Sequence, residues 1–325
     1  MKINSITKHP NTLKNYLSIF LKGMAMGIAE LIPGVSGGTI AFITGIYERF
    51  IEALQAFDLG LLRTLREEGL AAAWKRVDGN FLLTLAAGML ASIVLFIHLI
   101  TYLIEHEPLL LWAFFFGLIL ASVFFVGKHI PNWKLTNVIA LIAGAALAYY
   151  ITIASPANGN DALWMIYLSG AVAICAFLLP GLSGSFILLL LGMYPIVLGG
   201  IKNLDLVLIG VFALGCITGI LSFSKFLNWA FKHHKSLTLS VLTGFLVGSL
   251  NRVWPWQEVI SRRLNSKGVE VVEFTRSVLP SKFAELDATA NLPYGNDPQI
   301  LPVIGLMLLG IAAVVLLEKF GNGGE

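Results

Sequence analysis

Long apolar stretches alternate with short polar segments along most of the chain. Several of these runs have the length of a single membrane-crossing helix, which needs about 20 residues. They span 81–104, 109–127, 137–154, 206–230 and 299–318, and a shorter sixth run spans 237–250. This pattern predicts an all-α polytopic membrane protein.

Two other apolar stretches, Tyr16–Tyr47 and Ala162–Tyr194, are too long for one crossing, and each contains Pro-Gly-x-Ser-Gly near its middle. Proline removes a helix hydrogen bond and glycine permits positive φ, so each helix is expected to break there. A broken backbone at membrane depth survives only inside protein or beside a wet cavity. We therefore interpret residues 16–47 and 162–201 as helical hairpins or re-entrant loops with a tip inside the membrane.

The polar segments indicate an orientation. Residues 48–80 are expected to form an amphipathic surface segment, and residues 251–298 a long polar loop. The short loops 105–108 and 155–161 contain no lysine or arginine, whereas the segments that would lie on the opposite face are basic. The positive-inside rule then places both termini in the cytoplasm, and no cleavable signal peptide is expected.

The sequence contains an internal repeat. Residues 29–47 align without gaps on residues 176–194. Further along, a second constant spacing pairs Gly88 with Gly215 and other glycine, serine and aromatic positions. Matching glycine, proline and serine positions argue against the alternative, which is chance similarity between apolar segments.

Each half of the chain, 1–154 and 155–325, would then hold a broken hairpin followed by three crossings. An odd number of crossings inverts the second half relative to the first. Two inverted-topology repeats with interrupted helices at matching positions are typical of transporters and mark their binding sites. The sequence therefore favours a transport function.

Each motif would place the start of a helix at membrane depth. Such a start presents unpaired N–H groups and the positive end of the helix dipole. Glycines let an oxyanion approach and hydroxyls add donors, which suits a phosphate. The alternative is that small residues only let helices pack closely. The candidate substrate-binding residues are Pro33, Gly34, Ser36, Gly37, Gly38 and Thr39 in the first motif, and Pro180, Gly181, Ser183, Gly184 and Ser185 in the second.

A few ionisable residues fall within the apolar segments. A carboxylate at membrane depth costs about 2.5–3.5 kcal/mol, so Glu30 is a functional candidate that would carry a proton, neutralise a cation or cap the broken helix. Its repeat mate is Phe177, which places any proton coupling in the first half. Arg49 would pair with Glu30 or a phosphate, or anchor at the interface. His98 and Lys225, at matching repeat positions, would line a path for an anion or snorkel to the interface.

Composition supports the membrane assignment. Charged residues are 13% of the chain and hydrophobic residues 57%, whereas soluble domains carry about 25% charged residues. The two cysteines, Cys175 and Cys216, lie in apolar runs, so neither a disulfide nor a thiolate metal site is expected. No cofactor, metal or nucleic-acid partner is expected.

Three segments resemble the polyprenyl-phosphate transporter family. They are Glu-Leu-Ile-Pro-Gly-Val-Ser-Gly-Gly-Thr at 30–39, Gly-Ile-Tyr-Glu-Arg-Phe at 45–50 and Leu-Pro-Gly-Leu-Ser-Gly-Ser at 179–185. The resemblance covers nearly the whole chain. It implies return of undecaprenyl phosphate, the carrier lipid of cell-wall synthesis, from the outer to the inner leaflet of the bacterial cytoplasmic membrane. We expect alternating access, with protonation of Glu30 setting the direction.

Other functions stay open at this point. A small-anion exporter or channel would use the same anion pocket. An intramembrane serine protease would use Ser36 of the Gly-x-Ser-Gly sequence with His98 as its base, but the duplicated motif argues against it because a dyad needs one serine. A lipid phosphatase would need a histidine and arginine cluster that the sequence lacks. The chain is therefore expected not to be an enzyme.

Overall fold

The computed structural model describes residues 13–32, 35–154, 157, 159–264 and 270–322 of the 325-residue chain. Four helices within these ranges are long and apolar enough to cross a membrane. They are α6 (Gly79–His106), α7 (Pro108–Lys128), α8 (Leu135–Ile153) and α12 (Leu206–Ser249). The last helix, α14 (Ile300–Asn322), has a shorter apolar part, Ile300–Leu316. The prediction of a polytopic helical membrane protein is confirmed.

Both long apolar stretches break at their motif. In the first stretch, α1 (Leu13–Glu30) ends before the motif and the short helix α2 (Gly37–Ile43) starts within it. In the second, α9 (Leu163–Leu178) is followed by α10 (Gly184–Leu190) in the same way. A further sharp bend of 110° separates α10 from α11 (Tyr194–Lys202), and this pair has the form of a broken span or a re-entrant loop.

Residues 48–80 form three helices rather than one surface segment. The first, α3 (Tyr47–Gln55), is part of the core, with Phe50 and Ile51 buried. It packs on α12, where Asn228 donates a hydrogen bond to Gln55. α3 is amphipathic as expected, with Glu48 and Glu52 exposed, but its apolar face packs on the core of the protein. The next two helices, α4 (Leu59–Glu67) and α5 (Leu70–Arg76), carry mostly exposed side chains.

The two runs 206–230 and 237–250 lie in one continuous element, α12. His234 between them has non-helical backbone angles, with φ −137° and ψ 43°, so α12 consists of two helical parts that meet at a kink. The polar residues between the runs suggested a loop, and they form this kink instead.

The predicted polar loop 251–298 contains a β-hairpin, so the expectation of an all-α chain is wrong here. Strand β1 (Gln257–Leu264) pairs antiparallel with β2 (Glu270–Ser277), and Gln257 lies opposite Ser277. A short helix, α13 (Pro280–Phe283), follows. In both strands, β-branched residues are interspersed with polar and charged residues, so neither strand forms the long apolar run that marks the membrane helices. β-Branched residues nevertheless favour strands.

Helices pack through glycines in two matching sets of contacts. A Cβ at Gly88 of α6 would lie 2.1 Å from the Phe20 carbonyl oxygen of α1. At the paired position in α12, a Cβ at Gly215 would lie 2.0 Å from the Tyr167 carbonyl oxygen of α9. Both distances are far below a normal contact, so only glycine permits these helices to approach so closely. The crossing of α1 on α6 thus resembles the crossing of α9 on α12.

The later helices match in the same way, but they exchange partners between the halves. A Cβ at Gly117 of α7 would lie 2.0 Å from the Met307 carbonyl oxygen of α14. A Cβ at the paired Gly244 of α12 would lie 2.2 Å from the Leu141 carbonyl oxygen of α8. The last helix of each half therefore packs against the other half of the chain.

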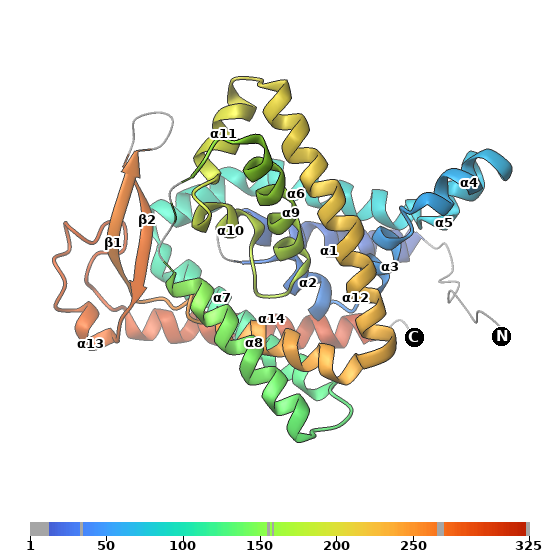
Figure 1. Ribbon diagram of the computed structural model, residues 1–325. Coiled ribbons are helices and arrows are strands. Elements are labelled where there is room, and N and C mark those ends of the chain that lie inside the picture. Colours follow the sequence, from blue (N-terminus) through green and yellow to red (C-terminus); the bar gives the residue numbers. More distant parts are fainter. Residues whose placement is uncertain (1–12, 33–34, 155–156, 158, 265–269, 323–325) are drawn as a thin grey trace.

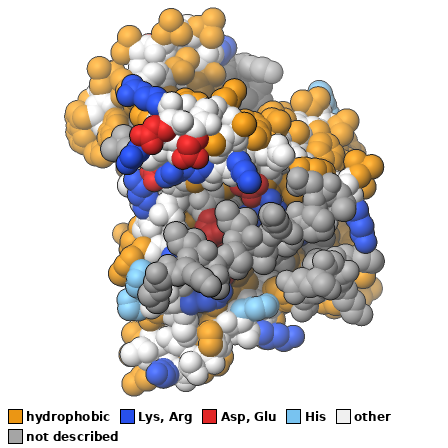
Figure 2. Space-filling model, turned by 90° about the vertical axis from the view of Figure 1, so that its right-hand side faces the viewer, with side chains coloured by type: hydrophobic (Ala, Val, Ile, Leu, Met, Phe, Trp, Pro, Cys, Tyr) orange, Lys and Arg blue, Asp and Glu red, His pale blue; other side chains and the backbone are white. Residues whose placement is uncertain are grey.

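The two ends of the molecule differ in character. In Figure 1, the β-hairpin lies at one end, while α4, α5, the kink of α12 and the last turns of α14 lie at the other. Figure 2 views this second end and shows lysine, arginine, aspartate and glutamate side chains gathered on it. The ion pairs Arg76–Asp58 and Lys235–Glu48 belong to this group. The long apolar helices lie between the two ends.

Candidate functional site

The two motifs meet inside the protein. The backbone N–H of Gly181 donates a 2.9 Å hydrogen bond to Oγ1 of Thr39, and the Ser36 hydroxyl donates to the Leu179 carbonyl oxygen over 3.2 Å. Thr39 and Ser36 are 0% and 1% exposed. Side chains of the first hairpin tip therefore supply hydrogen-bond partners to backbone groups that the break in the second hairpin leaves free.

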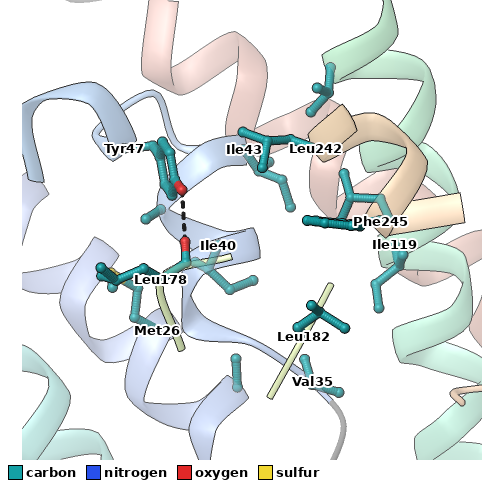
Figure 3. Packing of buried hydrophobic residues seen from close by; sticks show 14 of the residues in the cluster. Met26, Val35, Ile40, Ile43, Tyr47, Ile119, Leu178, Leu182, Leu242 and Phe245 are labelled. Atoms are coloured by element: carbon teal, nitrogen blue, oxygen red, sulfur yellow. Dashed lines mark hydrogen bonds between the residues drawn. The ribbon is translucent and has the colours of Figure 1, made fainter. Parts of the chain in front are cut away.

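Tyr47 adds a third bond between the hairpins. Its hydroxyl donates to the Leu178 carbonyl oxygen over 2.7 Å, as the dashed line in Figure 3 shows. That carbonyl belongs to the last turn of α9, where no further helical turn follows to bond it. Apolar side chains, among them Met26 and Ile40, lie around the bond (Figure 3). Burial leaves no water to replace it, so Tyr47 closes the joint between the tips.

The first tip is closed by its own residues. The Gly37 N–H donates to Oε1 of Glu30 over 2.6 Å, and the Gly38 N–H donates to the Ser36 hydroxyl over 3.1 Å. A Cβ at Gly37 would lie 2.8 Å from that Glu30 oxygen, so glycine is needed for the approach. Of the three roles open to Glu30, the structure shows that of a cap on α2. The hydroxyls expected to face an anion are engaged here.

The second tip is more open. Ser183 is the N-cap residue of α10, but its side chain does not cap the helix. Its hydroxyl lies 3.0 Å from that of Ser185. Ser183 is buried and Ser185 is exposed, so the pair leads from the interior to the surface. Gly181 has a φ of +83°, which explains why this turn needs glycine.

The remaining motif residues either lie outside the described part of the chain or are packed in the interior. Pro33 and Gly34 lie outside the described residues. Pro180 is buried at the second tip, and a Cβ at Gly184 would lie 2.6 Å from the Ala173 carbonyl oxygen, which makes that glycine a packing residue. Close packing and anion binding were both open for these positions, and the structure shows the packing.

Arg49 does not pair with Glu30. Its Nε donates to Oδ2 of Asp78 over 2.7 Å, and its guanidinium lies over the Phe81 ring, 4.2 Å from the ring centre. Lys22, which the sequence analysis did not single out, donates to the Thr44 carbonyl oxygen over 2.8 Å. A lysine inside an apolar hairpin could have been recognised from the sequence as a candidate functional residue, because ionisable residues are rare at membrane depth. Both cations lie on the first hairpin or next to it.

His98 and Lys225 lie exposed on α6 and α12. Neither residue lies between helices, because these faces of the two helices have no neighbouring helix within the described structure to cover them. The arrangement also speaks against a serine protease. The Ser36 hydroxyl is buried and donates to a carbonyl oxygen, whereas His98 is on the outer surface.

The described residues contain no group of three or more histidine, cysteine, aspartate or glutamate side chains that could hold a metal ion. Cys175 and Cys216 are free thiols. Their sulfur atoms donate to the Gly219 and Gly170 carbonyl oxygens, respectively, between α9 and α12. Both cysteines therefore act as small packing residues.

Comparison with known proteins identifies the family. The family model described as undecaprenyl phosphate translocase-like matches residues 26–271. A protein of Vibrio cholerae serotype O1 named polyprenyl-phosphate transporter is 44% identical over 308 residues, which cover 95% of this chain and 98% of that protein. A protein of Staphylococcus aureus with the same name is 32% identical over 256 residues, covering 72% and 85%. No solved structure matches the chain.

These names are those of transporters, not of enzymes. The resemblance of the three motif segments is confirmed over most of the sequence. The chain belongs to the undecaprenyl phosphate translocase-like family.

Proposed function

We propose that this protein transports polyprenyl phosphate, and undecaprenyl phosphate in particular, from the outer to the inner leaflet of the bacterial cytoplasmic membrane for reuse as a carrier lipid. The observation that carries the proposal is the 44% identity to a polyprenyl-phosphate transporter over 95% of this chain. The charged end of the molecule, which Figure 2 views, would face the cytoplasm, together with both termini.

The chain would work as two inverted repeats. The matched glycine contacts support this: α1 crosses α6 as α9 crosses α12, and α7 crosses α14 as the second part of α12 crosses α8. Exchange of the last helices links the two halves, so that one half can rock against the other without separating. The joined hairpin tips would lie on the axis between them.

The phosphate head would bind at the second tip. Ser183 and Ser185 offer two neighbouring hydroxyls, and the side chain of Ser183 leaves the first N–H groups of α10 uncapped. The corresponding groups of the first tip are occupied by Glu30 and Ser36. A lipid monophosphate needs a small polar pocket for its head while its tail stays in the lipid, and the exposed position of Ser185 suits such an arrangement.

Transport would require the tips to part. Three hydrogen bonds join them, from Ser36, Gly181 and Tyr47. At about 0.5–1.5 kcal/mol each, their loss costs about 2–4 kcal/mol. A gap of this size lets two states exchange and lets bound phosphate shift their populations. The tips would therefore act as the gate.

Glu30 would couple the gate to the proton gradient. Its carboxylate caps α2 at Gly37, and protonation would weaken this charge-assisted bond. Glu30→Gln separates capping from coupling, because a glutamine oxygen can still accept from the Gly37 N–H but takes no proton. We expect this variant to fold and to lose its dependence on the proton gradient.

The test is transport of labelled undecaprenyl phosphate in proteoliposomes, with and without a proton gradient. The wild type should move the lipid, and Glu105→Gln, at an exposed position on α6, should behave like it. A Glu30→Gln protein that responds normally to the gradient would refute the coupling. Inhibition by soluble phosphate as strong as by the lipid would instead favour a small-anion exporter or channel.

A further inference from the structure

Arg252 is a half-buried cation that has no carboxylate partner among the described residues. It follows the end of α12 and lies in the segment that leads into β1. Its Nη1 donates to the Thr275 hydroxyl over 3.0 Å, but its Nε is buried and has no acceptor in the described structure. None of the ion pairs among the described residues includes it. Buried arginines are normally paired, so this guanidinium has donors to spare.

The surroundings of Arg252 are aromatic and uncharged. The Cζ atom lies 4.9 Å from the centre of the Phe186 ring and 5.9 Å from that of Trp112. Tyr294 accepts a 3.2 Å bond from the Trp112 ring nitrogen nearby. Burial lowers the pKa of Arg252, which is the cost of holding a cation away from water. Cation–π contacts offset part of this cost without using the N–H groups.

Arg252 lies beside the second hairpin tip. Phe186 belongs to α10 and directly follows Ser185, whose hydroxyl is paired with that of Ser183. The guanidinium therefore packs on α10, the helix that begins at the second tip and carries Ser185. A pocket of about 400 Å³ flanks the same segment, and its lining includes Asn251, Trp254 and Ser277.

The β-hairpin fixes the backbone around Arg252. The Ser277 hydroxyl donates to the Asn251 carbonyl oxygen over 2.9 Å, and the Trp254 ring nitrogen donates to the Val278 carbonyl oxygen over 2.8 Å. These bonds hold the residues on either side of the arginine, and Thr275 holds its side chain. The polar segment 251–298 thus fixes the position of the Arg252 guanidinium.

We propose that Arg252 is the cation that receives the phosphate monoester head of the transported lipid and passes it to Ser183 and Ser185. This inference rests on the proposed function. A guanidinium offers a planar fork of donors that matches two phosphate oxygens, and the Nε of Arg252 has no acceptor among the described residues. The substrate would supply the partner charge that Arg252 lacks among the described residues.

Binding to the full-length protein in nanodiscs tests the inference. The probes are undecaprenyl phosphate and, as the uncharged control, undecaprenol. Arg276→Gln is the matched variant, because Arg276 stands in the β-hairpin that follows Arg252 but is exposed and paired with Glu258. Loss of a charge-assisted contact should weaken phosphate-lipid binding by about 10–100-fold in Arg252→Gln, and leave undecaprenol binding unchanged. Arg276→Gln should bind like the wild type.

The outcomes are distinct. Arg252→Gln that binds the phosphate lipid like the wild type overturns the inference, and so does equal loss of undecaprenol binding, which would mean a structural role. If this variant does not fold, Arg252→Lys decides: it keeps the charge without the fork and should bind about 3–10-fold more weakly, and binding equal to the wild type would overturn the inference. A wild type that does not prefer undecaprenyl phosphate to undecaprenol would refute the proposed function itself.

Discussion

Replacement of Thr39 by valine removes the hydroxyl group that joins the two hairpin tips through a hydrogen bond. Thr39 is fully buried, and its Oγ1 accepts the hydrogen bond from the Gly181 N–H over 2.9 Å. Valine has nearly the same shape, so Thr39→Val opens no cavity. What changes is that a backbone N–H at the second tip loses its acceptor in a dry interior.

Two magnitudes bracket the effect. A buried donor left without a partner costs about 1–3 kcal/mol in proteins generally. Hydrogen bonds between membrane helices contribute about 0.6 kcal/mol on average and about 1.7 kcal/mol at most. The Gly181 N–H lies in a turn at a helix break, where no neighbouring backbone group can replace the lost bond. We therefore expect Thr39→Val to destabilise the protein by about 1–2 kcal/mol.

Thermal unfolding in detergent, followed by circular dichroism, measures the change. Thr39→Ser keeps the hydroxyl and should remain closer to the wild type than Thr39→Val. Thr101→Val makes the same substitution at an exposed position on α6 and should have little effect. Equal stability of Thr39→Val and Thr101→Val would refute the claim that the Thr39–Gly181 hydrogen bond stabilises the contact between the tips. A Thr39→Ser protein as unstable as Thr39→Val would refute it too.

Two further predictions concern the same packing. Tyr47→Phe leaves the Leu178 carbonyl oxygen without its hydrogen bond and should lower stability by about 1–2 kcal/mol in the same unfolding assay. Tyr150→Phe, at an exposed position, should leave stability unchanged. Equal effects of the two variants would contradict a stabilising role of the Tyr47–Leu178 bond. Gly215→Ala would force a methyl group to within 2.0 Å of a carbonyl oxygen of α9 and should cost about 1–3 kcal/mol by overpacking. Gly210→Ala on the same helix, where nothing lies within 4 Å, should be neutral or stabilising, and a similar loss in both variants would show that α9 and α12 do not pack closely at Gly215.

Local chemistry made the breaks in the helices predictable. Proline and glycine act on their own backbone, so the motifs at 33–37 and 180–184 indicated where each helix would end. The internal repeat was likewise visible, since glycines at helix crossings such as Gly88 and Gly215 keep their spacing. The hydrogen bonds between the tips were not predictable, because they join residues that only the tertiary fold brings together.

Roles that depend on a partner were missed or left open. Glu30 had three possible roles, and only the position of the Gly37 N–H identifies the cap. Arg252 was not singled out, because an arginine in a polar loop is usually solvated, and its burial depends on a β-hairpin with no apolar run. The placement of His98 and Lys225 stayed open for the converse reason: an apolar sequence around a residue does not say which face of the helix it occupies.

The most direct test asks where the phosphate head binds. Photo-crosslinking of the reconstituted protein, with a polyprenyl phosphate analogue that carries its reactive group beside the phosphate, labels the residues in contact with the head. We expect adducts at residues 183–186 and 252, mapped by mass spectrometry, and competition by undecaprenyl phosphate. Labelling confined to the surface pocket of about 540 Å³ between Asn132 and Leu237, which is lined by two lysines and two histidines, would contradict a binding site at the second hairpin tip.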